Sequence, residues 1–577
     1  MTAAWRGALF ALVLLGSAHA FAAVGVPAPD SVVPATSQRL APWIERFRLD
    51  LASVEHTHDI TAGPRREAAL RALYTGWRDA LATVDVATLG AEDRIDHALF
   101  GRELRHRLGQ LDFERRRYEQ AAPLLPKVDT LIALAEARRA LAPVDTRAAA
   151  DVLNQANEAL TALDKRIEKP GKDDAPLADA IVAYRAARLL DGVREDLKQW
   201  FAFYDGYDPE FTYWTRQPYQ SLAKRLESHS ALLRDKLAGA SDPETIIGDP
   251  IGREALLAEL QYEMIPYTPE QLVTLAEREL AWTQAELQRA ALEMGHADWR
   301  DALEAVKRQG PLPGEQPQLV VQLADEAIAY VTGNDLVTVP ELARRDWRMT
   351  MLSPESQLQA PFFLGGEDVW VAYPHESMPQ EKKRMALRGN NRAFSRAVVH
   401  HELIPGHHLQ HFYTQRHQPH RQLFDTPFWS EGWALYWELR LYERGFARTP
   451  QEKIGMLFWR SHRAARILFS LSFHLGRMTP QQAVDLLVTR VGHERENAAA
   501  EVRRSFAGDY GPLYQAAYLL GGLQFRSLHR ELVEGGKMTE RQFHDAILMG
   551  GPMPVPFVRA RLKGEAPEAD WRFYPGL

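Results

Sequence analysis

Two pairs of adjacent histidines and one glutamate stand close together in the segment His400-His401-Glu402-Leu403-Ile404-Pro405-Gly406-His407-His408. Seven of the 20 histidines lie between positions 400 and 420, far more than an even spread would give. Neutral imidazole is the most common nitrogen ligand of zinc in proteins. The apolar residues Phe394 and Ala397 to Val399 indicate that the segment enters the core, where a histidine needs a partner. The cluster therefore predicts a metal site, and a solvated histidine-rich helix is the alternative interpretation.

The spacing of the histidines decides which of them could share one ion. In a helix, residues four apart lie about 6 Å apart on one face, but the residue four after His401 is Pro405. Proline cannot donate the helical hydrogen bond, and Gly406 tolerates unusual backbone angles. We expect a local bulge here, which favours His401 and His407 as the ligand pair. Two other pairs stay open, His401 with His408 and His400 with His407.

Carboxylates near the cluster could complete the site. Glu402 follows His401 directly, and in zinc peptidases a glutamate in this place takes the proton of the attacking water. Zinc usually takes a third protein ligand, for which we propose Glu431 in the first turn of a later helix. Glu438 lies two turns further on the same face, where it could orient a ligand histidine or form a surface salt bridge. Such a ligand set suits Zn²⁺, although the residues alone do not exclude manganese or cobalt.

The two motifs together resemble a known family. The first motif is His-Glu-x-x-Pro-Gly-His-His from His401, and the second is Glu-Gly-Trp-Ala-x-Tyr from Glu431. Together they resemble the domain-of-unknown-function eight-eight-five family, whose members are expected to be zinc hydrolases. That family is similar in architecture to helical zinc peptidases such as thimet oligopeptidase, angiotensin-converting enzyme and carboxypeptidase Taq. The resemblance implies that His401, His407 and Glu431 hold Zn²⁺ and that Glu402 is the general base.

A third stretch, residues 515–521, resembles the family's segment Gln-Ala-x-Tyr-x-x-Gly. The Pro-Gly that usually precedes it is replaced here by Pro512-Leu513-Tyr514, so the loop that enters this helix departs from the family pattern. Tyr518 could donate a hydrogen bond to the oxyanion of the reaction, or it could be an ordinary core tyrosine. Arg504 and Arg526 flank the stretch, and either could bind a substrate carboxylate or form a structural ion pair.

The rest of the chain predicts a mainly α fold, and its length predicts two large lobes or one large helical domain with subdomains. The resemblance to the helical zinc peptidases implies two lobes around a deep cleft. A typical helix start is Thr268-Pro269-Glu270-Gln271, where a capping threonine precedes proline and glutamine. A small β-sheet near the site is expected from residues 347–352 and 369–373, which are rich in β-branched and aromatic side chains. Val371 and Tyr373 in the second of these strands could bind an extended peptide by strand addition.

The ends and breaks of the chain suggest its organisation. Residues 1–23 have the charge, apolar run and small residues of a signal peptide, which predicts a periplasmic or extracellular protein. An uncleaved membrane anchor is the alternative, but we expect no stable membrane association after cleavage. The Gly- and Pro-rich stretch at 310–317 predicts a boundary between an N-terminal helical region, 24–310, and a catalytic region, 311–577.

Composition narrows the classes of function. The chain has 577 residues and no cysteine, which excludes disulfides, thiolate metal sites and a lipid-modified cysteine. Its net charge of -7 and the lack of a lysine-arginine tract argue against nucleic acid as a partner. We expect a zinc hydrolase, most simply a peptidase that cleaves short oligopeptides. The alternatives are a zinc amidase or esterase, a non-catalytic metal- or peptide-binding protein, and a purely structural protein. The cleaved end and the oligomeric state cannot be read from the residues.

Overall fold

The computed structural model describes residues 39–170, 177–242, 245–312, 314–357, 362–365, 368–507 and 510–577. The expected signal peptide, residues 1–23, lies outside the described residues. The described chain is mainly helical with one small sheet, as the sequence predicts. No helix within these ranges is both long enough and apolar enough to cross a membrane.

Two compact units make up the chain, and they divide between Ser241 and Asp242. The boundary expected at residues 310–311 therefore lies inside the second unit. The physical reason is packing: α10 (Pro269–Glu293) and α11 (Trp299–Lys307), which precede the expected boundary, both pack against α19 (Pro450–His474), which follows it. The helices on both sides of the expected boundary therefore belong to one unit.

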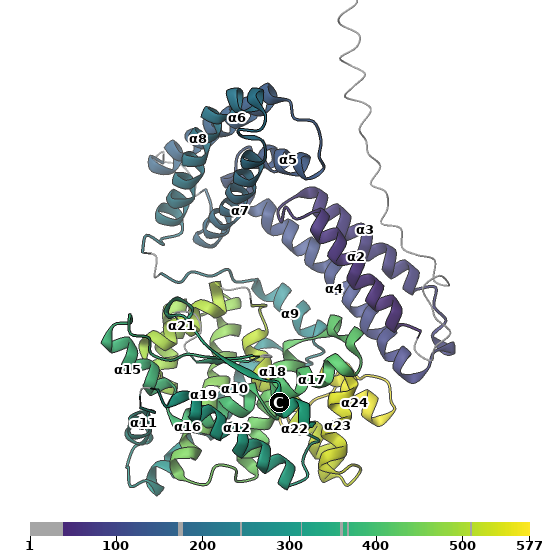
Figure 1. The fold of residues 1–577 in the computed structure, drawn as a ribbon, viewed down its shortest axis with the longest axis vertical. Helices are drawn as coiled ribbons and strands as arrows, with labels where there is room; N and C mark the ends of the chain where they lie inside the picture. The colour runs from purple at the N-terminus through teal and green to yellow at the C-terminus, as the bar shows by residue number, and fades with distance from the viewer. Residues whose placement is uncertain are drawn as a thin grey trace, which may run out of the picture. The chain divides into compact units, whose positions relative to one another are not determined.

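The first unit contains two groups of helices (Figure 1). In the group α2 to α4, the rings of Phe47, Trp77 and Phe100 pack against one another with centroids 5.2–6.1 Å apart. In the second group, α6 and α7 begin at aspartates that accept hydrogen bonds from the first-turn N–H groups. The helices are α2 (Ala41–Thr57), α3 (Pro64–Leu81), α4 (Ala91–Ala121), α5 (Val128–Arg139), α6 (Thr146–Glu168), α7 (Ala180–Tyr204) and α8 (Pro209–Leu232).

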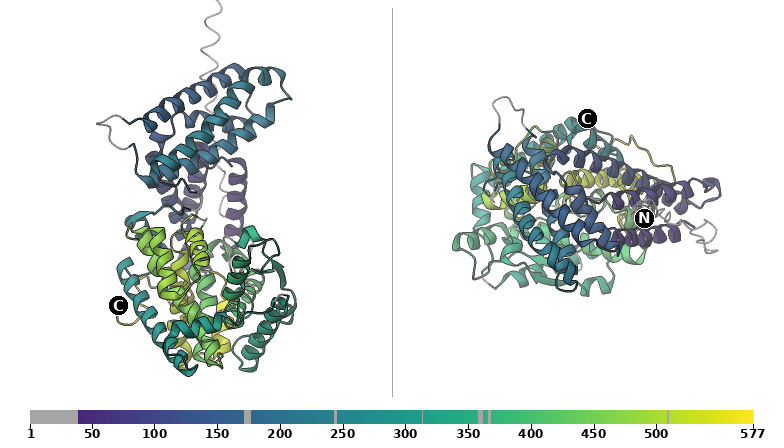
Figure 2. Two further views of the ribbon diagram at one scale, coloured as in Figure 1. Left: turned by 90° about the vertical axis from the view of Figure 1, so that its left-hand side faces the viewer. Right: turned by 90° about the horizontal axis from the view of Figure 1, so that it is seen from above.

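The second unit is a larger helical assembly, seen from further directions in Figure 2. Its α10 begins with the predicted capping box, in which Thr268 and Gln271 bond each other's backbone N–H. The helices are α9 (Gly252–Tyr262), α10 (Pro269–Glu293), α11 (Trp299–Lys307), α12 (Gln316–Gly333), α13 (Glu341–Arg345), α14 (Pro354–Gln357), α15 (Gln380–Gly389), α16 (Arg392–Glu402), α17 (His407–Arg416), α18 (Pro427–Glu443), α19 (Pro450–His474), α20 (Pro480–Leu486), α21 (Arg495–Ala507), α22 (Tyr514–His529), α23 (Glu540–Gly550) and α24 (Val555–Lys563).

Close packing of α18 against α22 positions the later site. A methyl group added at Gly432 would lie only 2.7 Å from the Cα of Gly521, so glycine at both positions lets the two backbones touch. α19 packs against α22 on one side and against α10 and α16 on others, and most of its residues are buried. The helices that carry the candidate residues therefore share one core.

The sheet has the strand order β1-β3-β2, with β1 at Arg348–Met351, β2 at Phe363–Leu364 and β3 at Asp368–Val371. β1 pairs parallel to β3, and β2 pairs antiparallel to it. Val371 therefore lies in the central strand, whose two edges are both paired. The hydroxyl of Tyr373 donates to the carbonyl of Leu312 at 3.0 Å. The expectation that these residues bind a peptide by strand addition does not hold for Val371, which pairs on both sides, and Tyr373 lies beyond the end of the strand, where its carbonyl accepts a hydrogen bond from Gln357.

Candidate metal centre

The segment after His401 breaks the helix in two. α16 ends at Glu402 and α17 begins at His407. A methyl group at Gly406 would lie 1.8 Å from the carbonyl oxygen of His401, so only glycine fits the turn. The indole of Trp433 donates to the carbonyl of Pro405 at 2.9 Å and holds the turn in place. The expected bulge inside one helix is therefore a full break, because proline and glycine leave too little of the helical ladder to continue.

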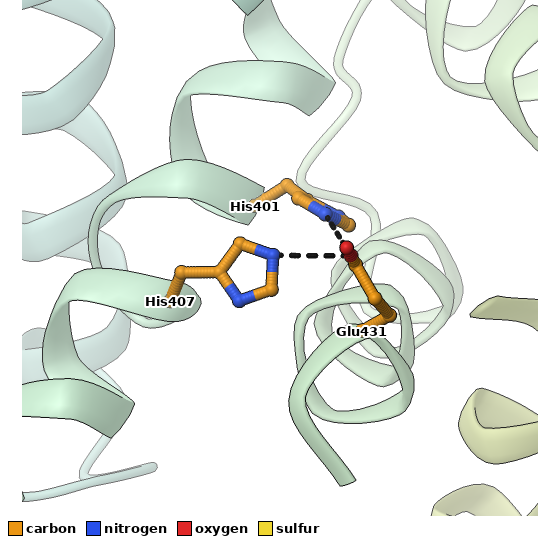
Figure 3. Close-up of side chains that lie close together, drawn as sticks. All are labelled: His401, His407 and Glu431. Atoms are coloured by element: carbon orange, nitrogen blue, oxygen red, sulfur yellow. Dashed lines mark hydrogen bonds and ion pairs between the residues drawn. The ribbon is translucent and has the colours of Figure 1, made fainter. Parts of the chain in front are cut away.

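This break brings three side chains together. Nε2 of His401 lies 3.3 Å from Oε2 of Glu431, and Nε2 of His407 lies 3.1 Å from the same oxygen (Figure 3). One ligand atom from each of the three residues lies within 4.8 Å of the others, and all three side chains are buried. In the described part of the chain, no other group of three such residues converges in this way. Two imidazole nitrogens and a carboxylate oxygen fit a zinc ion with a position left open.

The alternative histidine ligands point elsewhere. Nε2 of His408 lies 2.8 Å from the carbonyl of Ala343 and 2.9 Å from Asp346. Nδ1 of His400 donates to the carbonyl of Arg396 at 2.8 Å, and burial lowers the pKa of His400 to about 4. The pairs that use His400 or His408 are therefore not formed, and both side chains belong to the packing behind the site.

Glu438 lies behind the first ligand histidine, in the interior. Its Oε1 is 2.7 Å from Nδ1 of His401, and it also accepts a hydrogen bond from Arg463 at 3.2 Å. Burial opposes the charge of Glu438, but Arg463 and His401 outweigh it and hold the pKa of Glu438 at about 2. Burial likewise opposes a charged His401, yet Glu431 and Glu438 raise its pKa to about 9. The group is thus built to hold positive charge, and Glu438 is no surface salt bridge.

Glu402 faces a cavity of about 360 Å³ beside these ligands. Burial raises the pKa of Glu402, although His401 and His407 oppose this effect. A methyl group at Gly365 would lie 2.1 Å from Oε2 of Glu402, so the loop after β2 covers the carboxylate only because residue 365 is glycine. The cavity is lined by Phe362, Gly365, Val398, His401, Glu402, His407, His411, Asp425, Ser430, Glu431, Trp459, Arg463, Arg466, Arg504, Tyr510, Tyr514 and Tyr518.

Two tyrosines of α22 reach the site. The ring of Tyr518 is nearly parallel to that of His401, with centroids 6.0 Å apart, and Tyr518 lines the cavity as expected. The hydroxyl of Tyr514 donates to Oε1 of Glu431, a contact that sequence reasoning missed. Burial raises the pKa of both tyrosines, which keeps them protonated as hydrogen-bond donors. The available signal was their spacing, since residues four apart share a helix face.

Only one of the two arginines expected near the site lines the cavity. Arg504 lines the cavity, whereas Arg526 pairs with Glu443 at 2.5 Å and is absent from the cavity lining. The expectation of a substrate-binding role for Arg526 is thus replaced by a structural ion pair. Arg463 and Arg466 of α19 also line the cavity, and sequence reasoning missed both because nothing in α19 marks one face as a site.

The fold and this site define a large helical protein with a buried His–His–Glu group of the kind that binds divalent metal ions. The chain belongs to the family described as bacterial proteins of unknown function, DUF885, which matches residues 55–562. This confirms the family that the motifs of the sequence resemble. No curated protein is similar enough to the chain to match it.

Two solved structures are similar in fold. A candidate lipoprotein of unknown function from Shewanella oneidensis has a TM-score of 0.66 and 17% identity, and the match covers 92% of this chain and 100% of that one. A candidate lipoprotein from Colwellia psychrerythraea has a TM-score of 0.57 and 16% identity, with 93% of this chain and 99% of that one covered. At these identities the likeness concerns the fold alone.

Proposed function

We propose that this chain is an exported zinc-dependent hydrolase that cleaves short peptides. The observation that carries the proposal is the convergence of His401, His407 and Glu431 within 4.8 Å of one another, beside the half-buried carboxylate of Glu402 in the same cavity. Three protein ligands with an open position are typical of catalytic rather than structural zinc. A zinc ion held there would lower the pKa of a water molecule to near 7 and polarise a carbonyl group.

The residues around the ligands have the roles that hydrolysis requires. Glu402 accepts the proton of the attacking water and passes it to the leaving amine, for which a raised pKa is suited. The protonated hydroxyl of Tyr518 donates a hydrogen bond to the oxyanion that forms on the carbonyl. Tyr514 holds Glu431 in place through a hydrogen bond, and Glu438 holds His401 through an ion-pair contact of 2.7 Å. Gly365 packs closely against one oxygen of the Glu402 carboxylate and limits its movement.

The size of the cavity supports a small substrate. A volume of about 360 Å³ is at the lower end of the range for small-molecule sites, which suits one or two residues of a peptide. Export is supported by the signal-like residues at 1–23 and by the two similar structures, which are candidate lipoproteins. The chain itself has no cysteine to carry a lipid.

The test combines metal analysis with digestion of a peptide library read by mass spectrometry. We expect one zinc ion per chain, cleavage of short peptides, and loss of cleavage in a Glu402→Gln variant that keeps its zinc. Side-by-side turnover of an ester library separates a peptidase from an esterase. A zinc-loaded protein that cleaves esters but no peptide would refute the peptidase assignment, and full activity of Glu402→Gln would refute the general base.

A further inference from the structure

One wall of the cavity carries more positive than negative charge. The guanidinium groups of Arg463, Arg466 and Arg504 all line it. Only two carboxylates of the described residues lie within ion-pair distance of these groups: Glu438 contacts Arg463 at 3.2 Å, and Glu501 contacts Arg466 at 2.7 Å and Arg504 at 3.6 Å. Three cations thus share two anions. Because Glu438 also contacts His401, its negative charge does not fully neutralise the positive charge of Arg463.

Each of these three arginines has a buried N–H without a hydrogen-bond partner among the described residues, which in Arg463 is Nε. Nη1 of Arg466 is buried and has no hydrogen-bond partner among the described residues, although the side chain is only 4% exposed. Nε of Arg504 is also buried without a partner, since 3.6 Å to Glu501 is too long for a hydrogen bond. A buried donor without an acceptor is costly, and because these arginines line the cavity, a ligand that accepts hydrogen bonds would offset part of that cost.

Arg466 lies close to a candidate metal ligand, with the ring of Tyr518 between them. The guanidinium carbon of Arg466 lies 4.3 Å from the ring centroid of Tyr518, and the ring of Tyr518 faces that of His401 at 6.0 Å. One aromatic ring therefore separates Arg466 from a candidate ligand. An anion bound to Arg466 would belong to the part of the substrate next to the bond that is cleaved, because the cavity holds only one or two residues.

We propose that Arg466 and Arg504 bind the terminal carboxylate of a peptide, so that the enzyme removes residues from the carboxyl end. This inference rests on the proposed function. The planar guanidinium group matches the two oxygens of a carboxylate, which makes arginine the residue suited to recognise it. Arg463 differs from these two because its carboxylate partner, Glu438, also contacts the candidate ligand His401. Glu501 positions both binding arginines from behind.

A binding experiment without turnover tests the proposal. The zinc-loaded Glu402→Gln protein is titrated by calorimetry with a tripeptide that has a free carboxylate and with its carboxy-amide. We expect the free acid to bind roughly 30-fold or more tightly, the scale for loss of one partner of a buried charged contact. Arg504→Gln in the same background should bring the affinity for the acid close to that for the amide. Arg526→Gln is the matched control, since this arginine pairs with Glu443 outside the cavity, and it should keep the preference.

Equal affinity of the Glu402→Gln protein for acid and amide would overturn the proposal, and so would a preference that survives Arg504→Gln in a folded protein. Folding of each variant is checked by circular dichroism and by zinc content.

Digestion of matched peptides keeps the two proposals apart. The wild-type enzyme is given a peptide as the free acid, as the amide, and as an amide with a glutamate near its end. Cleavage of the free acid alone supports carboxylate recognition. Equal cleavage of acid and amide refutes it but leaves the hydrolase intact. Cleavage of the amide only when it contains glutamate shows that the arginines bind an acidic side chain. This result also overturns the proposal that they bind the terminal carboxylate. If no peptide or ester is cleaved by the zinc-loaded protein, the proposed function itself fails.

Discussion

Nδ1 of His401 and Oε1 of Glu438 lie 2.7 Å apart in the interior of the second unit. The contact assigns one ring nitrogen of His401 to the carboxylate and leaves Nε2 to face Glu431 and His407. A carboxylate behind a ligand histidine fixes the orientation of the ring and raises its basicity. The single buried side chain of Glu438 therefore links α18 to the candidate metal ligand on α16.

Replacing Glu438 with glutamine should weaken zinc binding by about 10-fold or more, because the neutral amide is a poorer partner for the imidazole. Competition with a chromophoric chelator measures the affinity. Glu443→Gln, on the same helix but paired with Arg526, should leave zinc affinity unchanged. Equal affinity in the Glu438→Gln protein and the wild type would show that this contact does not support a ligand.

Gly406→Ala should damage both the fold and the site. The added methyl group would lie 1.8 Å from the carbonyl of His401, so the turn between α16 and α17 must shift. We expect a loss of about 2 kcal/mol or more of unfolding free energy together with reduced zinc content. Gly333→Ala is the control, because a methyl group there meets nothing within 4 Å. Urea unfolding and metal analysis measure the two effects, and a stable Gly406→Ala protein with normal zinc would contradict the geometry.

Substitutions of the two tyrosines of α22 should affect different properties, the turnover rate in one case and zinc affinity in the other. Tyr518→Phe should lower kcat by about 100-fold with normal zinc affinity, since its hydroxyl acts only on the oxyanion. Tyr514→Phe removes the hydrogen bond to Glu431 and should weaken zinc binding instead. Steady-state kinetics at saturating zinc and chelator competition give the two readouts. A Tyr518→Phe enzyme with unchanged kcat would remove this tyrosine from the mechanism.

Stability should fall in mild acid because of histidines buried away from the cavity. His544 donates from Nδ1 to Leu336 and accepts at Nε2 from the hydroxyl of Tyr436, both at 2.8 Å. Burial lowers the pKa of His544 to about 3, whereas in the unfolded chain it is about 6.5. The unfolded state therefore binds the proton first, and stability is lost as the pH falls from 6.5 toward 3.

This loss amounts to about 1 kcal/mol for His544 by pH 5.5. Urea unfolding of the wild type and of His544→Gln at pH 7.5 and pH 5.5, with a chelator present, measures it. The metal ligands then contribute equally to both proteins, so the pH dependence should be shallower in the variant by that amount. The same dependence in both proteins would contradict the prediction.

The two candidate histidine ligands could be predicted because they lie in one local motif. Pro405 and Gly406 predict a break after His401. Beyond the break, His407 faces Glu431 as His401 does, whereas His408 faces the carbonyl of Ala343. The sequence could not decide between a bulge and a full break, because that depends on how Gly406 packs against the backbone of His401.

Residues brought to the site by long-range packing were harder to predict. Arg466 comes from α19 and Tyr514 from α22, and neither lies in a recognisable motif. Arg504 and Arg526 both flank residues 515–521 in the sequence. Only Arg504 lines the cavity, whereas Arg526 pairs with Glu443. The strand at Val371 was expected correctly, but its central place in the sheet follows from pairing that residue types do not reveal.

The metal content of the protein tests most directly whether His401, His407 and Glu431 hold one metal ion. His407→Ala and His408→Ala are a matched pair, because the residues are adjacent and both are buried. Mass spectrometry of the purified proteins should find one zinc ion per chain in the wild type and in His408→Ala, and almost none in His407→Ala. Zinc that is retained in His407→Ala but lost in His408→Ala, or absent from the wild type after zinc loading, would contradict the account.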